Sequence, residues 1–493
     1  MQERLSLVVS CRLGLNLRCH IIILSVPGFF VQSFGCRATQ ADSAALERQL
    51  AAQGLSPAKS AIEAEFVVLN TCTVTAAADQ DARASIRRIH RENPAAKIMV
   101  TGCYAQRAPQ EIAALPGVTW VVGNSHKHQV AEIAGAQDWI SNISQDEPAE
   151  QNDRPGNFIS LETVALSAPA FTLVGDIFAH TELIAAPVFA GEGIAEKTRP
   201  NLKVQDGCDN RCSFCIIPSV RGQSRSMKLE RVIEEASALV AAGYRELVLS
   251  GINLGRWGRD FQPQRRFEQL VHALLEHTGI EKIRISSVEP MDWSDELIAL
   301  VAGSPRIAKH AHVPLQSGSD RILRRMHRKY RPWHYAEKIR KIHEAMPHAA
   351  IGADVMVGFP GETDELFEES RSFIERLPFT YLHVFTYSSR PGTPSAAMPD
   401  QVPVHVARER NRVLRELAAE KNRAFRRSFV GRSLEVITLH AGGDGWTEAL
   451  SDNFLKVRLA GRCEANKSLR VDVMEIGNED LVAVAAEENA YAL

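Results

Sequence analysis

The sequence predicts an α/β protein with three folded parts: a doubly wound parallel N-terminal domain, a central partial TIM-like (β/α)6 barrel and a small C-terminal β-barrel. The chain has 493 residues, which is more than one hydrophobic core usually organises. Twice along the chain, short β-rich runs alternate with helical stretches, a pattern typical of parallel sheets. From about residue 430 the chain contains only short β-like runs between glycine-containing turns, which favours a small barrel.

Composition narrows the class of protein. Lys and Arg number 57 and Asp and Glu 59, a net charge of −2, so a nucleic-acid surface would have to come from local clusters. The nine cysteines are an odd number in a long chain, which argues against a secreted disulfide framework. No apolar run is long enough to cross a bilayer. We therefore expect a cytoplasmic protein without a membrane, whose clustered cysteines are metal ligands or catalysts.

The N-terminal domain is expected at 27–135. Residues 1–26 lack the order of a signal peptide, and we expect this leader to be dispensable or not translated. The expected strands are FFVQS (29–33), FVVLN (66–70), KIMVT (97–101) and VTWVV (118–122). The helical stretches between them predict a doubly wound sheet.

A polar, proline-broken linker is expected at 136–198, and the barrel at 199–429. The six expected barrel strands are NLKVQ (201–205), ELVLS (246–250), KIRISS (282–287), KHAHVP (309–314), ADVMVGF (353–359) and YLHVFTY (381–387). Active sites of such barrels open at the carboxyl ends of the strands. The tail at 430–493 contributes the β-like runs LEVITLH, FLKVRLA, SLRVDVMEI and LVAVAA.

Three cysteines follow the first barrel strand in the run QDGCDNRCSFCIIP. Cys208, Cys212 and Cys215 form C-x3-C-x2-C, and neither a histidine nor another cysteine lies near enough in sequence to complete a four-ligand zinc site. Free cysteines that are merely structural prefer apolar cores to a polar loop. Three thiolates instead suit a [4Fe–4S] cluster with one iron left open.

This loop resembles that of the radical S-adenosylmethionine (SAM) superfamily, in which the open iron binds the amino and carboxylate groups of SAM. The resemblance implies that Phe214 meets the adenine of SAM. It also places GIN, Gly251 to Asn253, at the family's Gly-Gly-Glu motif, where Asn253 replaces the glutamate. A SAM contact and a plain strand-ending turn both stay open for this segment.

Three more cysteines each follow a strand of the N-terminal domain. Cys36, Cys72 and Cys103 lie one to three residues beyond FFVQS, FVVLN and KIMVT. Ligand sites of open α/β sheets lie at these carboxyl ends, so the three thiols should converge. Each cysteine singly is more often a buried small residue, but all three together favour a second cluster with an open iron.

Two such cysteine sets followed by a β tail resemble the radical SAM methylthiotransferases. The motifs that carry the resemblance are NTCTVT, VTGCYAQ, CIIPSVRGQSRS, PLQSGSD, VGFPGET and SSRPGTP, spread over 29–484. The sequence departs from the family at Thr39, where asparagine is usual three residues after the first cysteine. VQDGCDN and LHVFTYSSRPGTP are most similar to the threonylcarbamoyladenosine (MtaB-type) branch.

The resemblance implies an enzyme that adds a methylthio group to carbon 2 of N6-threonylcarbamoyladenosine at position 37 of tRNA, beside the anticodon. It implies two [4Fe–4S] clusters and two SAM molecules, one methylating a sulfur and one cleaved to a 5′-deoxyadenosyl radical. An electron donor such as flavodoxin or ferredoxin and a sulfur donor are implied as well. The alternatives are the isopentenyladenosine tRNA branch, the ribosomal-protein aspartate branch, and a non-enzymatic Fe–S or zinc RNA-binding protein.

Two basic stretches are candidates for binding the anticodon stem-loop. Residues 320–343 carry a net charge of +7 and residues 404–432 a net charge of +6. Such runs are usually solvated helix faces, but a tail that looks like the RNA-binding TRAM domain raises the case for RNA. The candidate phosphate contacts are Arg324, Arg325, Arg426 and Arg427.

Other polar residues at barrel strand ends are candidates for SAM or base contacts. Glu289 could bind a ribose hydroxyl or cap the helix after Pro290. Gln316 in PLQSG is a candidate cofactor contact. Asp354 lies within a strand, where a structural hydrogen bond is expected.

Overall fold

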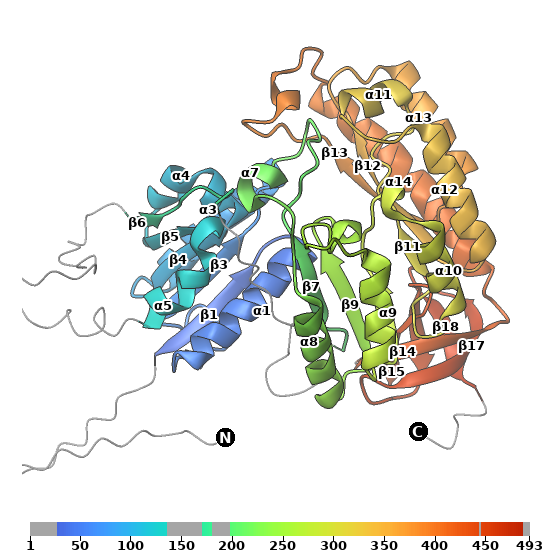
Figure 1. Ribbon diagram of the computed structural model, residues 1–493, viewed down its shortest axis with the longest axis horizontal. Coiled ribbons are helices and arrows are strands. Elements are labelled where there is room, and N and C mark those ends of the chain that lie inside the picture. Colours follow the sequence, from blue (N-terminus) through green and yellow to red (C-terminus); the bar gives the residue numbers. More distant parts are fainter. Residues whose placement is uncertain (1–26, 136–169, 180–197, 443–444, 487–493) are drawn as a thin grey trace, which may run out of the picture.

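The computed structural model describes residues 27–135, 170–179, 198–442 and 445–486, which form an N-terminal sheet domain, a central barrel and a C-terminal β-barrel (Figure 1). The predicted leader and most of the predicted linker lie outside these residues. None of the described helices is long and apolar enough to cross a membrane.

The N-terminal domain is a sheet of parallel strands in the order β2-β1-β3-β4-β5-β6. Its strands are β1 (Gly28–Ser33), β2 (Ser56–Pro57), β3 (Phe66–Thr71), β4 (Lys97–Gly102), β5 (Val118–Gly123) and β6 (Phe171–Leu173). Its helices are α1 (Arg37–Ala52), α2 (Ala76–Glu92), α3 (Cys103–Arg107), α4 (Pro109–Ala113), η1 (Asn124–Gln129) and α5 (Val130–Gly135).

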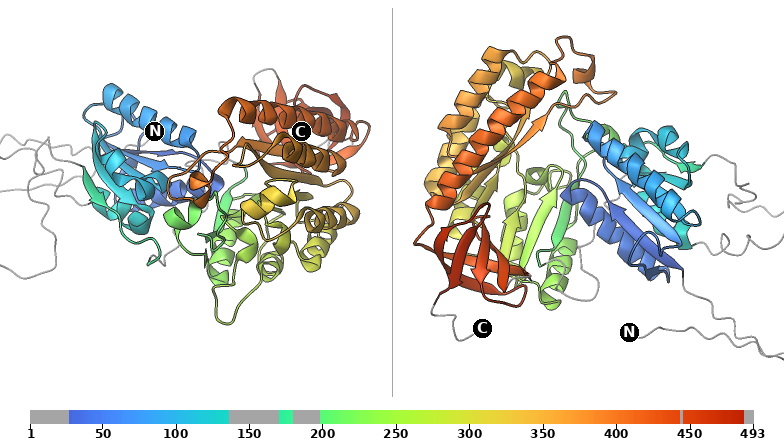
Figure 2. Two further views of the ribbon diagram at one scale, coloured as in Figure 1. Left: turned by 90° about the horizontal axis from the view of Figure 1, so that it is seen from above. Right: turned by 180° about the vertical axis from the view of Figure 1, so that it is seen from behind.

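Both faces of this sheet are covered. Val67 and Leu69 of β3 pack under α2, α3 and α4, whereas Phe66 and Val68 pack under α1 and α5. The alternation confirms the doubly wound class (Figure 2). The placement of Phe171–Leu173 in the linker was wrong, because these residues pair with β5 as an edge strand. A three-residue strand gives too short a pattern to detect.

The central barrel follows the predicted strand–helix order. Its strands are β7 (Asn201–Asp206), β9 (Glu246–Gly251), β10 (Lys282–Ile285), β11 (His310–His312), β12 (Ala350–Val357) and β13 (Tyr381–Thr386), with a short antiparallel β8 (Arg225–Ser226). Its helices are α7 (Ile217–Arg221), α8 (Leu229–Ala241), α9 (Phe267–His277), α10 (Asp295–Gly303), α11 (Asp320–Arg325), α12 (Pro332–Ala345) and α13 (Asp364–Arg376). Single-turn helices η2 (Leu254–Arg256), η3 (Pro290–Asp292) and η4 (Pro394–Ala397) complete it.

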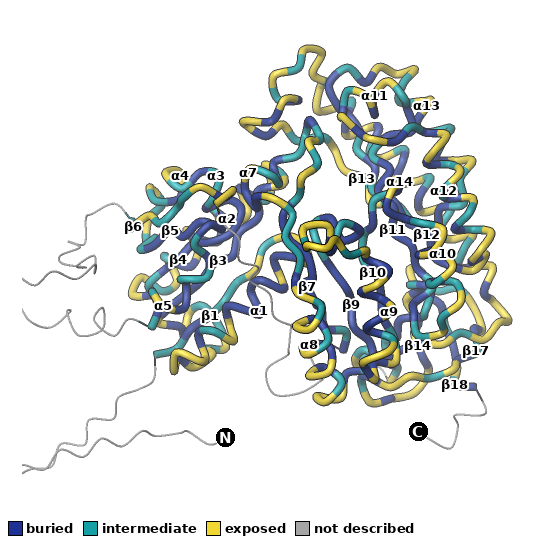
Figure 3. The backbone as a smooth tube through the Cα atoms, viewed as in Figure 1, coloured by how far each residue is buried: buried dark blue, intermediate teal, exposed yellow. Residues whose placement is uncertain are grey.

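The barrel strands form an open arc. Hydrogen bonds join β7, β9 and β10 in one sheet and β11, β12 and β13 in another, and isolated bridges such as Ser287 to His312 connect the two. In the described chain β7 and β13 do not pair, so the arc is open on one side. Strands and inward helix faces are buried while the outer helix faces are exposed (Figure 3).

The N-terminal domain contacts both edges of this opening. On the β7 edge, the Asn201 side chain donates to the Arg37 carbonyl at 2.7 Å. Beyond the β13 edge, Arg390 forms an ion pair with Asp79 at 2.7 Å. The cysteines of the N-terminal sheet are therefore held beside the barrel.

The tail is a closed barrel in the order β14-β15-β16-β18-β17, joined to the central barrel by the long helix α14 (Val404–Arg427). Its strands are β14 (Ser433–Ala441), β15 (Trp446–Ser451), β16 (Lys456–Ala460), β17 (Ser468–Ile476) and β18 (Leu481–Ala485). Strand β15 was not predicted, because WTEALS has little β-branched character. The three-part fold class is confirmed.

Candidate functional site

The three barrel cysteines lie on a loop that leaves the carboxyl end of β7. Gly207 turns the chain with a φ of +70°, and a side chain there would lie 1.9 Å from the Gln223 carbonyl oxygen. The Cys208 amide then donates to the Gly222 carbonyl at 3.1 Å. The Ser213 hydroxyl anchors the middle of the loop to the Arg325 carbonyl at 2.7 Å.

The thiols of this loop influence one another. Burial raises the pKa of Cys215 to about 12, and the neighbouring Cys212 and Cys208 also raise it. Burial likewise raises the pKa of Cys208, against a hydrogen bond from the Asn210 amide. Three partly buried, adjacent thiols can become thiolates together only beside a compensating positive charge, as a bound iron cluster provides.

Arg328 is a site residue that sequence reasoning missed. Its guanidinium is buried, donates to the Cys212 sulfur at 3.2 Å and is also bonded to Glu289. Glu289 therefore faces the cysteine loop through Arg328, and its side chain does not cap the helix after Pro290. The one signal in the sequence is that Arg328 belongs to the basic run 320–343.

The GIN segment also meets the cysteine loop. The Asn253 side chain donates to the Cys208 sulfur at 3.6 Å, and its buried carbonyl oxygen has no hydrogen-bond partner in the described chain. The backbone amide of Asn253 donates to the Gln205 side-chain oxygen at 2.7 Å. Gly251 leaves room for Gln205, since a side chain at Gly251 would lie 3.0 Å from it. The orphaned oxygen beside a cysteine fits a SAM amine.

The remaining predicted cofactor contacts lie further along the strand ends. Phe214 is half-buried and packs edge-on against Phe359, with ring centroids 6.5 Å apart. Gln316 has a left-handed backbone with φ 67°. Its amide donates to the Asp354 carbonyl and its carbonyl accepts from the Met356 amide, each at 2.8 Å.

The three N-terminal cysteines follow the neighbouring strands β1, β3 and β4. Cys36 is exposed and precedes α1, whereas Cys72 and Cys103 are buried. A side chain at Gly35 would lie 2.6 Å from the Cys72 β-carbon, so the first loop lies close to the second cysteine. Burial raises the pKa of Cys72 to about 12, and Cys103 and Cys36 raise it as well. The structure thus brings the three thiols together.

Polar neighbours contact this second set. The Thr39 hydroxyl lies 3.6 Å from the Cys36 sulfur, so the residue that departs from the family pattern contacts the first cysteine directly. The Asn124 side chain donates to the Cys103 sulfur at 3.5 Å. Asn124 was not predicted as a site residue. It follows β5, and no cysteine follows this strand, unlike the other three strands predicted for this domain.

The two cysteine sets are neighbours. Cys103 packs against Ile216, the residue after Cys215. Burial opposes the charge of Arg221 on α7, but Asp206, then Cys103, Asp42 and Cys36, raise its pKa well above the usual value. Arg221 is therefore held between the cysteine loop that precedes it and the N-terminal thiols.

The four candidate RNA contacts have different environments. Arg324 is exposed and pairs with Asp320 at 2.8 Å, while Arg325 is half-buried. Arg427 is exposed at the end of α14. The prediction for Arg426 was wrong about its accessibility: it is buried and donates to the carbonyls of Gly477, Asn478 and Asp480 at 3.1–3.2 Å.

Comparison with known proteins gives the same division of the chain. The profile of the Radical SAM superfamily matches residues 202–374, and that of the Uncharacterized protein family UPF0004 matches residues 28–123. The radical SAM methyltransferase TsrM from Kitasatospora setae superposes with a TM-score of 0.51 at 14% identity, over 76% of this chain and 74% of TsrM, a likeness of fold.

Relatives of similar length extend the match to nearly the whole chain. The chain is 36% identical to threonylcarbamoyladenosine tRNA methylthiotransferase MtaB of Bacillus subtilis, over 90% of this chain and 93% of that protein. It is 34% identical to MtaB of Aquifex aeolicus, over 89% and 98% of the two chains. It is also 33% identical to tRNA-2-methylthio-N(6)-dimethylallyladenosine synthase of Thermobifida fusca, over 90% and 83%.

The residues fit the cofactors of this superfamily, SAM and [4Fe–4S]. Each cysteine set offers three thiols, which leaves one iron of a cluster open, and Asn253 offers an unsatisfied acceptor beside one of them. Together with the agreement along nine-tenths of the sequence, this shows that the chain belongs to the radical SAM methylthiotransferase family, enzymes that modify tRNA.

Proposed function

We propose that the protein adds a methylthio group to carbon 2 of N6-threonylcarbamoyladenosine at position 37 of tRNA. The observation that carries the proposal is the identity of 36% and 34% to two proteins named for this nucleoside, each matched over most of its length. The motifs VQDGCDN and LHVFTYSSRPGTP agree with this branch.

Within this proposal the two cysteine sets have different roles. Cys208, Cys212 and Cys215 would hold the cluster whose open iron would bind SAM, because they lie at the strand end of the barrel beside Asn253. Cys36, Cys72 and Cys103 would hold the second cluster, which would supply the sulfur to be transferred. The bound cofactors supply the radical chemistry that an unactivated aromatic C–H bond requires.

The protein's own residues position and neutralise these groups. Arg328 donates to the Cys212 sulfur, and Arg221 places positive charge beside the N-terminal thiols, so both sets can ionise inside the protein. The contact between Cys103 and Ile216 keeps the two sets adjacent and places apolar surface between them. A base must be unstacked from its loop to reach this point.

The proposal includes partners that donate electrons and sulfur, tRNA binding through the tail and α14, and a cytoplasmic location. Exposed arginines of α14 that support RNA binding include Arg408, Arg412 and Arg415. Arg412 pairs with Glu409 and Glu416, so its charge is partly neutralised and less available to a phosphate than the net charge of the stretch suggests.

Mass spectrometry of tRNA nucleosides from a deletion strain tests the substrate. We expect 2-methylthio-N6-threonylcarbamoyladenosine to disappear, with the unmethylthiolated nucleoside accumulating in its place, and complementation to restore it. Loss of the 2-methylthio-isopentenyl nucleoside instead would favour the second candidate, which the 33% identity to the Thermobifida fusca enzyme supports. No change in either nucleoside would contradict both.

A further inference from the structure

Strand β13 presents an exposed aromatic side chain, Phe385, on the inner face of the barrel arc. The alternate residues Leu382 and Val384 pack against the hydrophobic core. Successive side chains of a strand point to opposite faces, so Phe385 and His383 lie on the inward face. In the sheet order β11-β12-β13 this strand is an edge strand, on the open side of the arc, and Phe385 is 48% exposed there. A single exposed apolar residue is common, so the position of Phe385 carries the argument.

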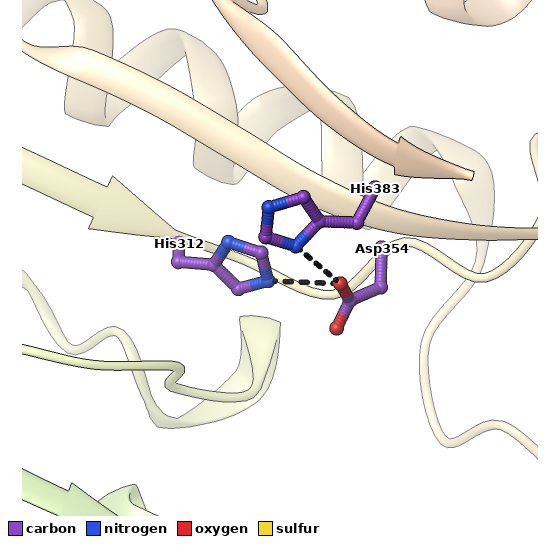
Figure 4. Close-up of side chains that lie close together, drawn as sticks. All are labelled: His312, Asp354 and His383. Carbon is purple, nitrogen blue, oxygen red and sulfur yellow. Dashed lines mark hydrogen bonds and ion pairs between the residues drawn. The ribbon is translucent and has the colours of Figure 1, made fainter. Parts of the chain in front are cut away.

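A polar group one step deeper along the strand holds the Phe385 ring. The His383 imidazole meets this ring in a T-shaped arrangement, with centroids 6.4 Å apart and planes at 70°. Figure 4 shows that the imidazoles of His383 and His312 both point to the Asp354 carboxylate. Their Nδ1 and Nε2 atoms lie 3.3 and 3.2 Å from the same oxygen. The fixed imidazole therefore limits the directions that the Phe385 ring can take.

The barrel cysteine loop lies on one side of Phe385. In the register of the sheet, Phe385 pairs with Met356 of the neighbouring strand β12. Met356 and Phe214 pack against the same small apolar cluster, and Phe214 directly precedes Cys215. Phe385 is therefore one strand away from the apolar contacts of the loop that would hold the SAM-binding cluster.

The N-terminal cysteines lie on the other side. The segment after β13 contacts the loop that follows Cys72. The Ala76 amide donates to the Ser388 hydroxyl at 3.1 Å, and the Arg390 guanidinium donates to the Thr73 carbonyl at 3.4 Å. Thr73 directly follows Cys72. The inward face at the end of β13 thus lies between the two cysteine sets.

We infer that Phe385 is the stacking platform for the adenine ring of the substrate nucleotide, once this base has been unstacked from the anticodon loop. The inference rests on the proposed function and deepens it. Every base offers a π-face, and proteins that recognise single-stranded RNA commonly stack unstacked bases on aromatic side chains. Stacking uses the face of the adenine and leaves its edges free. Carbon 2 can then be reached from both cysteine sets, and the N6 substituent stays outside the contact.

A binding comparison with two anticodon stem-loops tests the inference. One RNA carries N6-threonylcarbamoyladenosine at position 37, and the other carries an abasic nucleotide there. Fluorescence anisotropy measures both dissociation constants with the reconstituted protein and SAM at one fixed salt concentration, without reductant, so that no turnover occurs. We expect Phe385→Ala to weaken binding of the modified RNA about 5- to 100-fold, the range typical of base–aromatic stacking, and to leave binding of the abasic RNA unchanged.

Three further variants sharpen this comparison. Phe385→Tyr keeps the aromatic face and should bind both RNAs like wild type. His383→Leu removes the T-shaped contact and should weaken only the RNA that carries the base, by less than Phe385→Ala. Trp333→Ala is the control: Trp333 is also an exposed aromatic residue, but it lies on α12, so its effect should be the same on both RNAs. Iron content and thermal unfolding check that each variant retains its clusters and fold.

An equal effect of Phe385→Ala on the two RNAs, including no effect on either, would overturn the inference. Unchanged RNA binding together with loss of 5′-deoxyadenosine release in the absence of RNA would overturn it as well, because the ring would then pack against SAM. The proposed nucleoside is tested separately. Wild-type methylthiolation of isopentenyl RNA alone would refute that nucleoside, whereas the abasic comparison still decides the inference, since stacking involves the adenine ring that both nucleosides share.

Discussion

At the scale of single residues, each cysteine set has a buried arginine beside it, which places positive charge next to the thiols. Arg328 contacts the Cys212 sulfur, and Arg221 lies near Cys103 and Cys36. Hydrogen bonds and charges next to cluster sulfurs set reduction potentials, because they stabilise the more negative, reduced state. These two arginines are therefore expected to tune the two clusters separately.

Cysteine substitutions should separate the two sets. Cys212→Ala removes a thiolate from a set that has only three, so reductive SAM cleavage and release of 5′-deoxyadenosine should be lost. Cys72→Ala leaves the barrel loop intact and, with dithionite, should still release 5′-deoxyadenosine while transferring no methylthio group. Loss of 5′-deoxyadenosine in a folded Cys72→Ala protein that retains one cluster would show that the division of roles is incorrect.

Replacing Arg328 with methionine should lower the midpoint potential of the barrel cluster. The change removes a positive charge and a hydrogen bond at 3.2 Å from the Cys212 sulfur. A redox titration followed by electron paramagnetic resonance in a Cys72→Ala background, with only the barrel cluster, measures the shift. Arg324→Met is the control, since Arg324 is exposed and pairs with Asp320; equal potentials in the two variants would argue against the contact.

At the scale of elements, two adjacent arginines at the end of helix α14 have different roles. Arg426 faces inward and donates to three carbonyls around β18, whereas Arg427 faces solvent. A helix turns about 100° per residue, so neighbours in sequence point to different surroundings. One arginine therefore joins the helix to the tail and the other is free for phosphate.

Replacing each arginine with alanine should affect a different measurement, unfolding for Arg426 and tRNA binding for Arg427. Arg426→Ala removes three hydrogen bonds from a charged donor and should destabilise the tail by about 1.5–3 kcal/mol, measured by thermal unfolding. Arg427→Ala should leave unfolding unchanged and reduce the log–log salt slope of tRNA binding by about 1 if it contacts one phosphate. An unchanged slope would mean that Arg427 is only solvated.

At the scale of the whole molecule, a buried charge network joins the N-terminal domain to the barrel. Asp42 of α1 accepts from Lys127 at 2.9 Å and from Arg221 at 3.1 Å, and also pairs with Lys203 of β7. Lys203 and Arg221 in turn pair with Asp206, two residues before Cys208. The network thus links the relative position of the domains to the start of the cysteine loop.

Asp42→Asn should destabilise the protein by about 3–5 kcal/mol at pH 7, because it removes one of the two carboxylates that three buried cations share and leaves Lys127 without its ion-pair partner. Burial alone would raise the pKa of Asp42, but Lys127, Lys203 and Arg221 lower it below the usual value. The carboxylate therefore stabilises the fold above its unfolded pKa of about 4, and this contribution is lost as the pH falls through the lower folded pKa.

Urea unfolding of wild type and Asp42→Asn between pH 3 and 7 measures this contribution. The difference between the two proteins should shrink as the pH falls below about 4. Arg48→Ala is the control across the same interface: its pair with Glu235 at 3.6 Å is half-exposed on the arginine side and should contribute at most about 1 kcal/mol. A difference independent of pH would exclude the ionised carboxylate as its cause.

The sequence by itself determined the fold class, the six parallel barrel strands and the two cysteine sets. These features are encoded locally: strand periodicity is read within a few residues, and a cysteine just beyond a parallel strand lies at the sheet's ligand-binding edge. The short strand β6 and strand β15, which lack strong β patterning, could not be predicted in this way.

Only the tertiary structure decided which residues surround those cysteines. Arg328 meets Cys212 across 116 positions of sequence, and His383 meets Asp354 across 29. Arg426 and Arg427 look alike in the sequence, yet one is buried and the other exposed. The physical reason is that burial and side-chain partners depend on which elements pack together, and neither charge nor spacing along one helix specifies that packing.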